Sequence, residues 1–264
     1  MKSAVGCWGL AFLAWTFGLP AGAQAQSGQP CTVAAQGAAG LRIGGSEVEP
    51  PLSSGDCRGA VVARGAVVAC TSGADGLPMC RAFGAGQTID LAAAGAAPSA
   101  DGLAGLQRVL RVRPGQAAGQ PRGAETLLPS KVVLMLDAVL LVDFAEADMQ
   151  DVDAVEFRRD AVDGPVAARI DRVPGPASTS GAPFTAGPYY WSVPIPGGRP
   201  NQTPRRFSVA SESERQAALE SLRAFERQQA GPLATAMMRA AWLAQRNYDY
   251  DALATMKAVG LRTR

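Results

Sequence analysis

The chain has 264 residues, with 25 Lys and Arg against 23 Asp and Glu, a formal net charge of +2, and no His. The absence of His excludes Ser-His-Asp triads, Cys-His dyads and His-containing zinc sites, and the nearly balanced charge gives no reason to expect nucleic acid or an anionic membrane as a partner. The 30 Gly and 19 Pro favour turns and linkers, while an apolar fraction of 47% is enough to build a packed core.

Residues 1–25 have the pattern of a secretory signal peptide. A basic residue at position 2 precedes an apolar stretch over 4–19, and Ala23-Gln24-Ala25 is a small-x-small cleavage site, so we expect a mature chain that begins at Gln26. The alternative is an uncleaved anchor, but the stretch is shorter than the about 20 residues of a spanning helix. Arg greatly outnumbers Lys, as in high-GC bacterial genomes. These features predict a bacterial protein that is periplasmic or secreted, with no membrane span after signal cleavage.

Four cysteines follow the predicted signal peptide: Cys31, Cys57, Cys70 and Cys80. An even number in an oxidising compartment predicts two disulfides, and four cysteines allow three pairings. We favour Cys70–Cys80 with Cys31–Cys57, because the first pair closes a short loop rich in turn residues. A metal site is the alternative, but the C-x-x-C spacing and His ligands of such sites are missing.

Residues 26–113 are predicted to form a cysteine-containing β domain. Two apolar runs, 59–63 and 66–70, are separated by Arg64-Gly65, which is the signal of a β-hairpin. The Ala-, Gly- and Pro-rich stretch 92–105 is expected to be a flexible excursion, and 106–112 alternates loosely between apolar and polar residues. Residues 114–126, rich in Gly, Gln, Ala and Pro, are predicted to be a linker.

Residues 127–210 are predicted to form a small β-sandwich, because short apolar runs recur at even spacing between Gly- and Pro-containing turns. The runs are 132–136, 139–144, 152–157, 166–170, 189–193 and 207–210. Residues 211–264 are predicted to be helical. Ser211 and Glu214 form a capping-box pattern, and Gly231-Pro232 ends one helix and starts the next. The expected fold class is therefore mainly β, with two to three C-terminal helices.

Two motifs in this region carry a resemblance to known proteins. Residues 187–193 read GPYYWSV and residues 207–215 read FSVASESER. They resemble the end of an Ig-like or fibronectin-III-like sandwich in exported bacterial proteins, where it leads into helices. Such sandwiches often follow a FecR-like β domain. The residues GAVV at 65–68 and GAGQ at 84–87 resemble the pattern of that domain, in which a glycine-valine strand is followed by a glycine before a polar strand. The resemblance implies a FecR-like domain at 26–113, an Ig-like domain at 127–210 and a non-catalytic role in binding or assembly. It transfers no catalytic residues.

Two groups of side chains are candidates for a site. The first is an acidic cluster formed by Asp143, Glu146, Asp148, Asp151, Asp153 and Glu156. Asp148, Asp151 and Asp153 could bind Ca²⁺, although the residue order of an EF-hand loop is missing; a paired acid and base, or a solvated strand edge, are the alternatives. The second is Tyr189-Tyr190-Trp191, where alternation on a strand puts Trp191 in the core and leaves Tyr190 as the possible ligand contact.

These observations predict a non-enzymatic exported envelope protein that acts as a protein-binding, signalling or assembly module, with no cofactor. Its partner would be another envelope protein. The first alternative is a carbohydrate- or peptidoglycan-binding protein that recognises a cell-wall polymer, in a Ca²⁺-dependent way if the acidic cluster holds the ion. The second alternative is a hydrolase that works without His, using two carboxylates.

Overall fold

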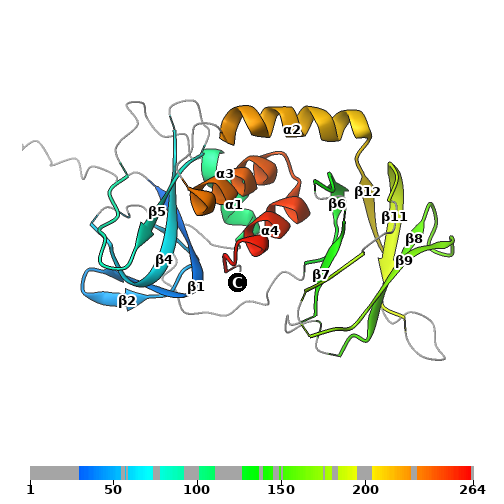
Figure 1. Cartoon of the computed structure of the whole chain (residues 1–264), viewed down its shortest axis with the longest axis horizontal. Helices are drawn as coiled ribbons and strands as arrows, with labels where there is room; N and C mark the ends of the chain where they lie inside the picture. The colour runs from blue at the N-terminus through cyan, green and yellow to red at the C-terminus, as the bar shows by residue number, and fades with distance from the viewer. Residues whose placement is uncertain are drawn as a thin grey trace, which may run out of the picture.

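The structure is a computed structural model that describes residues 30–54, 57, 59–73, 78–91, 101–110, 127–136, 139–144, 149, 151–174, 176–179, 184–194, 204–226 and 231–262. The fold is mainly β, as predicted: an N-terminal sheet carries two disulfides, a second, mixed sheet follows, and helices end the chain (Figure 1). The predicted signal peptide and linker lie outside the described residues. No helix of the described part is long and apolar enough to cross a membrane.

The first sheet is antiparallel and is built around two long strands. Its strands are β1 (Cys31–Ile43), β2 (Ser46–Val48), β3 (Leu52–Ser54), β4 (Val61–Ser72) and β5 (Pro78–Gly84). The order is β2-β1-β4-β5, and β3 also pairs with β1. The disulfides join Cys31 to Cys57 and Cys70 to Cys80, which are the two pairs that the sequence favours.

Both faces of β4 are buried from Val67 to Ser72, and this explains the unbroken apolar run at 66–70. Val67 and Ala69 belong to a core cluster enclosed by the first sheet itself. Val68 and Cys70, which alternate with them, belong to a larger cluster that continues into the helices and the second sheet. Since successive side chains of a strand point to opposite faces, one strand contributes to both cores.

The predicted hairpin at Arg64-Gly65 is wrong. The two apolar runs form the single strand β4, and the irregularity lies in its neighbour β1, where the register shifts between Gln36 and Gly40. Gly65 has φ +72°, and a Cβ added there would lie 2.8 Å from the Cβ of Ala39. The glycine therefore allows the bulge of β1 to lie close against β4. In the sequence, the same Arg-Gly pair has the pattern of a hairpin turn.

The second β unit combines a five-stranded sheet with a two-stranded one. The larger sheet has the order β6 (Lys131–Val133), β12 (Arg205–Val209), β11 (Gly187–Ser192), β8 (Ala154–Arg159) and β9 (Val166–Asp171). Its β6–β12 pair is parallel and the others are antiparallel. The smaller sheet pairs β7 (Leu141–Asp143) with β10 (Pro176–Ser178). β10 was not expected, because its Pro-Gly-Pro surroundings predict a turn; a Pro at the first position of a short strand is tolerated.

Four helices complete the described part of the fold: α1 (Asp101–Val109), α2 (Glu212–Glu226), α3 (Pro232–Gln245) and α4 (Asp249–Ala258). α1 corrects the prediction of a flexible excursion for residues 101–105 and of loose alternation for residues 106–109, while residues 92–100 and 111–112 lie outside the described part of the chain. In α1 the residues Leu103, Leu106 and Val109 recur at helical spacing and are buried. The capping box is confirmed, since Ser211 N–H donates to Glu214 Oε2 at 2.8 Å and Glu214 N–H donates to Ser211 Oγ at 3.2 Å.

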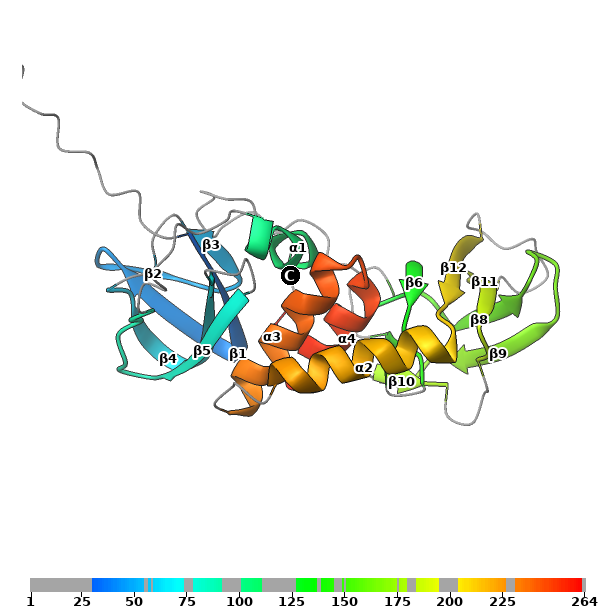
Figure 2. The ribbon, with the colours of Figure 1, turned by 90° about the horizontal axis from the view of Figure 1, so that it is seen from above.

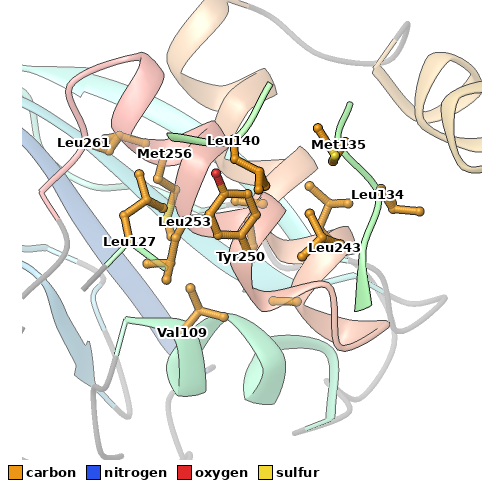
Figure 3. Close-up of a cluster of buried hydrophobic side chains, with 14 of the residues drawn as sticks. Val109, Leu127, Leu134, Met135, Leu140, Leu243, Tyr250, Leu253, Met256 and Leu261 are labelled. Carbon is orange, nitrogen blue, oxygen red and sulfur yellow. The ribbon is translucent and has the colours of Figure 1, made fainter. Parts of the chain in front are cut away.

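The helices α1, α3 and α4 lie between the two β units in both views, and α2 runs along one side of them (Figure 1, Figure 2). α3 packs on β4 and β5 of the first sheet, while α4 packs on β6 of the second. The core between them is shared: Val109 of α1, Leu134 and Leu140 beside the second sheet, and Tyr250 and Met256 of α4 converge in one cluster (Figure 3). The helical layer therefore joins the two β units through one hydrophobic core.

Candidate functional site

The acidic cluster of the sequence is divided among different contacts. Asp143, at the end of β7, forms an ion pair of 2.8 Å with Lys257 of α4, and both side chains are largely buried. Glu156 in β8 pairs with Arg158 at 2.9 Å and with Arg169 at 3.1 Å. These two carboxylates therefore stabilise neighbouring elements.

Only two of the three residues suggested for Ca²⁺ belong to the part of the chain that the structure describes. Asp151 and Asp153 are exposed and lie directly before β8. Asp148 lies outside the described residues. Within the described ranges, no three His, Cys, Asp or Glu side chains are grouped as metal ligands.

Asp249, the first residue of α4, links three elements that are distant in sequence. Its carboxylate pairs with Arg108 of α1 and with Lys131 of β6, both at 2.8 Å. Arg108 also donates to the carbonyl of Ala244 in α3. Burial alone would raise the pKa of Asp249, but the hydrogen bonds and charges of the two cations lower it below its ordinary value. This junction holds the helical layer against the second sheet.

Asp251, two residues further on, is almost completely buried, with 4% of its surface exposed. Its carboxylate accepts the backbone N–H groups of Leu134 at 2.8 Å and Met135 at 3.0 Å. Met135 has φ +54°, a conformation that non-glycine residues rarely adopt, so the carboxylate holds a turn that would be unfavourable alone. Burial raises the pKa of Asp251 to about 6, despite the opposing effect of these hydrogen bonds.

Neither Asp249 nor Asp251 was predicted from the sequence as part of a site. Acidic residues in the first turn of a helix are favoured by the helix dipole, so Asp249 and Asp251 look ordinary in the sequence. Their partners lie more than a hundred positions away, and no short motif predicts such a contact. The junction is structural, because its groups are engaged with one another and with backbone.

The aromatic trio follows the predicted alternation along β11. Tyr189 and Trp191 are buried, with Tyr189 stacked on Phe207 at 5.5 Å between ring centroids and the Trp191 Nε1–H donating to the carbonyl of Pro129 at 2.9 Å. Tyr190 points to the opposite face and is half-buried. The expectation that Trp191 belongs to the core is confirmed.

Tyr190 lies in a row with two arginines. In the ladder registers it is directly opposite Arg206 of β12 on one side and Arg158 of β8 on the other. Directly opposite residues on adjacent strands place their side chains on the same face, about 5 Å apart at Cβ. We call Arg158, Tyr190 and Arg206 the Arg-Tyr-Arg row. It crosses the central strands of the larger sheet, on the face opposite to Tyr189 and Trp191.

The two arginines of this row differ in their contacts and in their exposure. Arg158 is held by Glu156 and by the carbonyl of Gly164, to which it donates at 3.0 Å. Arg206 is exposed and forms no ion pair with the described part of the chain. The row therefore combines one positioned guanidinium, one exposed guanidinium and an aromatic ring. Such a set can bind a carboxylate or phosphate through the guanidinium groups and a flat apolar or sugar surface on the ring.

Comparison with known proteins adds no relative to this geometry. No protein-family model matches the sequence, and no curated protein matches it. The arrangement of its residues makes the Arg-Tyr-Arg row the candidate site.

Proposed function

We propose that the chain is a non-enzymatic exported protein of the bacterial envelope that binds another envelope protein. The observation that carries this proposal is the Arg-Tyr-Arg row on the larger sheet of the second β unit. Arginine and tyrosine are the residues most enriched in the parts of protein interfaces that contribute most to affinity, together with tryptophan. The two disulfides favour an oxidising compartment, in agreement with the predicted signal peptide.

The engaged carboxylates of the fold and the position of the row support a role in binding over a role in catalysis. The largely buried carboxylates Asp143, Asp249 and Asp251 each hold another element of the fold, so their charges are already engaged. The row lies in a part of the molecule whose far end, formed by β8 and β9, is the most distant from the first sheet in both views (Figure 1, Figure 2). A partner could approach this end without displacing the helical layer.

The test is capture of partners from a bacterial envelope extract by the immobilised protein, with identification by mass spectrometry. We expect one or a few specific proteins with the wild type, and at least a tenfold loss with Tyr190→Ala or Arg206→Glu. Arg42→Glu, on the exposed part of β1 in the first sheet, is the matched control and should bind like the wild type. Equal capture by all four proteins would contradict the proposal, as would turnover of a substrate by the purified protein.

A cell-wall polymer is the second candidate partner, and the half-buried ring of Tyr190 between two guanidinium groups favours it. Sugar rings stack on aromatic faces, and the arginines would pair with acidic groups of the polymer. Sedimentation with purified cell wall separates this candidate from the first. Binding that is lost in Tyr190→Ala would support it, and loss on addition of a chelator would add a role for Ca²⁺; a protein that stays in the supernatant would exclude it.

A further inference from the structure

The strand β9 forms one border of the larger sheet. It pairs with β8 on one side, and no described strand pairs with its other side. Figure 2 shows β9 at the outer margin of the second β unit. The backbone groups on the free side of an edge strand can pair with another strand, and proteins usually protect such an edge or use it.

The hydrogen bonds of β9 identify the residues that face outward. The N–H of Arg172 donates to the carbonyl of Asp153 at 2.7 Å, so residue 172 points its backbone groups toward the chain segment leading into β8. Backbone groups alternate in direction along a strand, and those of Arg169 and Asp171 therefore point away from β8, to the free edge. Both side chains are exposed.

The two outward residues carry opposite charges two positions apart. Arg169 also forms an ion pair of 2.8 Å with Asp171 within the chain. When two copies of this strand pair antiparallel about a twofold axis through Ile170, Arg169 of each copy is opposite Asp171 of the other. A shift by one residue of the axis in either direction would place Arg169 opposite itself or Asp171 opposite itself, and like charges directly opposite one another are unfavourable. Among these three registers, only the one centred on Ile170 places opposite charges against each other.

We propose that two copies of the chain associate through their β9 edges in this register. In this register Arg169 of one copy and Asp171 of the other form a hydrogen-bonded pair of the new ladder. The backbone groups of both residues are then hydrogen-bonded, and their side chains carry opposite charges. Val173, with 42% of its surface exposed, is opposite Ala167 of the second copy and loses contact with water. The association joins two larger sheets into one continuous sheet with twofold symmetry, and it is independent of the partner proposed for the Arg-Tyr-Arg row.

Cysteine cross-linking tests the register directly. Two proteins are compared, Arg169→Cys and Asp171→Cys, both with Cys7→Ser so that the introduced thiol is the only one outside the two disulfides. Paired residues of an antiparallel ladder have Cα atoms about 5.5 Å apart, within the range of a disulfide. We expect a cross-linked dimer when the two proteins are mixed and oxidised, with little in either protein alone. The mixed dimer also retains one Arg169–Asp171 pair. Cross-linking of either protein with itself to the same extent would contradict the register, and no cross-linking in the mixture would contradict the association.

Charge reversal provides an independent test by sedimentation velocity. Arg169→Glu makes the edge uniformly acidic and Asp171→Lys makes it uniformly basic, so each variant alone should dimerise about tenfold more weakly than the wild type. An equimolar mixture should recover the affinity as a heterodimer. Asp171→Lys leaves the Glu156–Arg169 pair in place, and circular dichroism checks that both variants fold. A wild type that stays monomeric, or a mixture no better than its components, would overturn the proposal.

Discussion

Asp251 of α4 and Leu134 after β6 are joined by a hydrogen bond of 2.8 Å from the backbone N–H of Leu134 to the buried carboxylate. The bond crosses the border between the helical layer and the second β unit. Nearby, the Tyr250 hydroxyl contacts the backbone of Leu141, and Lys257 pairs with Asp143. The short helix α4 thus holds the second β unit by polar contacts along its length.

The buried carboxyl of Asp251 predicts a specific dependence of stability on pH. Its pKa is about 6 in the native state and 3.8 as the ordinary value, so between these values the native state holds a proton that the unfolded chain has released. The stabilisation from this group is complete below pH 3.8 and is lost as the pH rises through 6. Between pH 5 and pH 7.5 we expect it to lower the free energy of unfolding by about 1 kcal/mol.

Urea denaturation at pH 5, 6 and 7.5 measures this effect in the wild type and in Asp251→Asn. The variant keeps one acceptor oxygen and does not titrate, so its stability should change less over this range than that of the wild type. Asp151→Asn, at an exposed position, is the control and should follow the wild type. The same pH dependence in Asp251→Asn would show that another group is responsible.

Gly65 predicts a large effect for a single methyl group. Gly65→Ala is strained at φ +72°, and its Cβ would lie 2.8 Å from that of Ala39. We expect a loss of about 2–3 kcal/mol in the free energy of unfolding. Gly86→Ala is the matched control, since Gly86 has φ +80° but nothing within 4 Å of an added Cβ, and it should lose only about 1 kcal/mol. Equal losses in urea denaturation would mean that the contact with Ala39 relaxes freely.

The capping box at the start of α2 predicts a smaller effect. Ser211→Ala removes the acceptor of the Glu214 N–H, and we expect it to lower the free energy of unfolding by about 1 kcal/mol. Ser221→Ala is the control, because the Ser221 hydroxyl only bonds back to the carbonyl of Ala217 in the same helix. Thermal unfolding of both variants gives the comparison, and a larger loss in Ser221→Ala would contradict the role of the cap.

The two disulfides are predicted to differ in their contribution to stability. They close loops with sequence separations of 26 and 10 residues, for Cys31–Cys57 and Cys70–Cys80 respectively. On chain-entropy grounds, replacing both cysteines of a pair by Ala should cost about 3.5 kcal/mol for the longer loop and about 2.7 kcal/mol for the shorter one. Guanidinium denaturation of the two double variants checks the order. The reverse order would indicate that packing around Cys70 and Cys80 outweighs loop closure.

Features that depend on neighbours in sequence were predictable here. The Ser211–Glu214 cap and the alternation that buries Trp191 are confirmed, because a cap and a strand face are determined within a few residues. α1 was not predicted because it is nine residues long and contains two Gly, and its helical form depends on packing against α3. Arg64-Gly65 was misread because the same residues serve a hairpin turn or a bulged ladder, and only the strand opposite distinguishes them.

Only one of the three residues of the candidate site was predicted from the sequence. Tyr190 was recognised as the ring that faces away from the core, but its neighbours Arg158 and Arg206 come from strands before and after it. Their alignment depends on the registers of the β11–β12 and β11–β8 strand pairs. The register of a strand pair is a tertiary property that cannot be read from a single sequence. Arg205-Arg206 could only be seen as a local pair of basic residues. The ladders assign them different roles, since Arg205 lies over the Trp191 ring at 5.6 Å.

The end of the described chain pairs with its beginning. Between the stretches of β1 paired with β3 and with β2, the backbone of residues 35–37 bonds to residues 260–262: Gly37 N–H donates to Gly260, and Arg262 N–H donates to Ala35 at 2.7 Å. The outer edge of the first strand is therefore completed only after residues 260–262 have been synthesised. Until residues 260–262 have been made, the N-terminal sheet lacks this partner of β1, although α1 and α3, the helices that pack on β4, precede α4 in the chain. Folding of this protein should be a late, concerted event in which a fragment ending before α4 stays vulnerable to proteolysis.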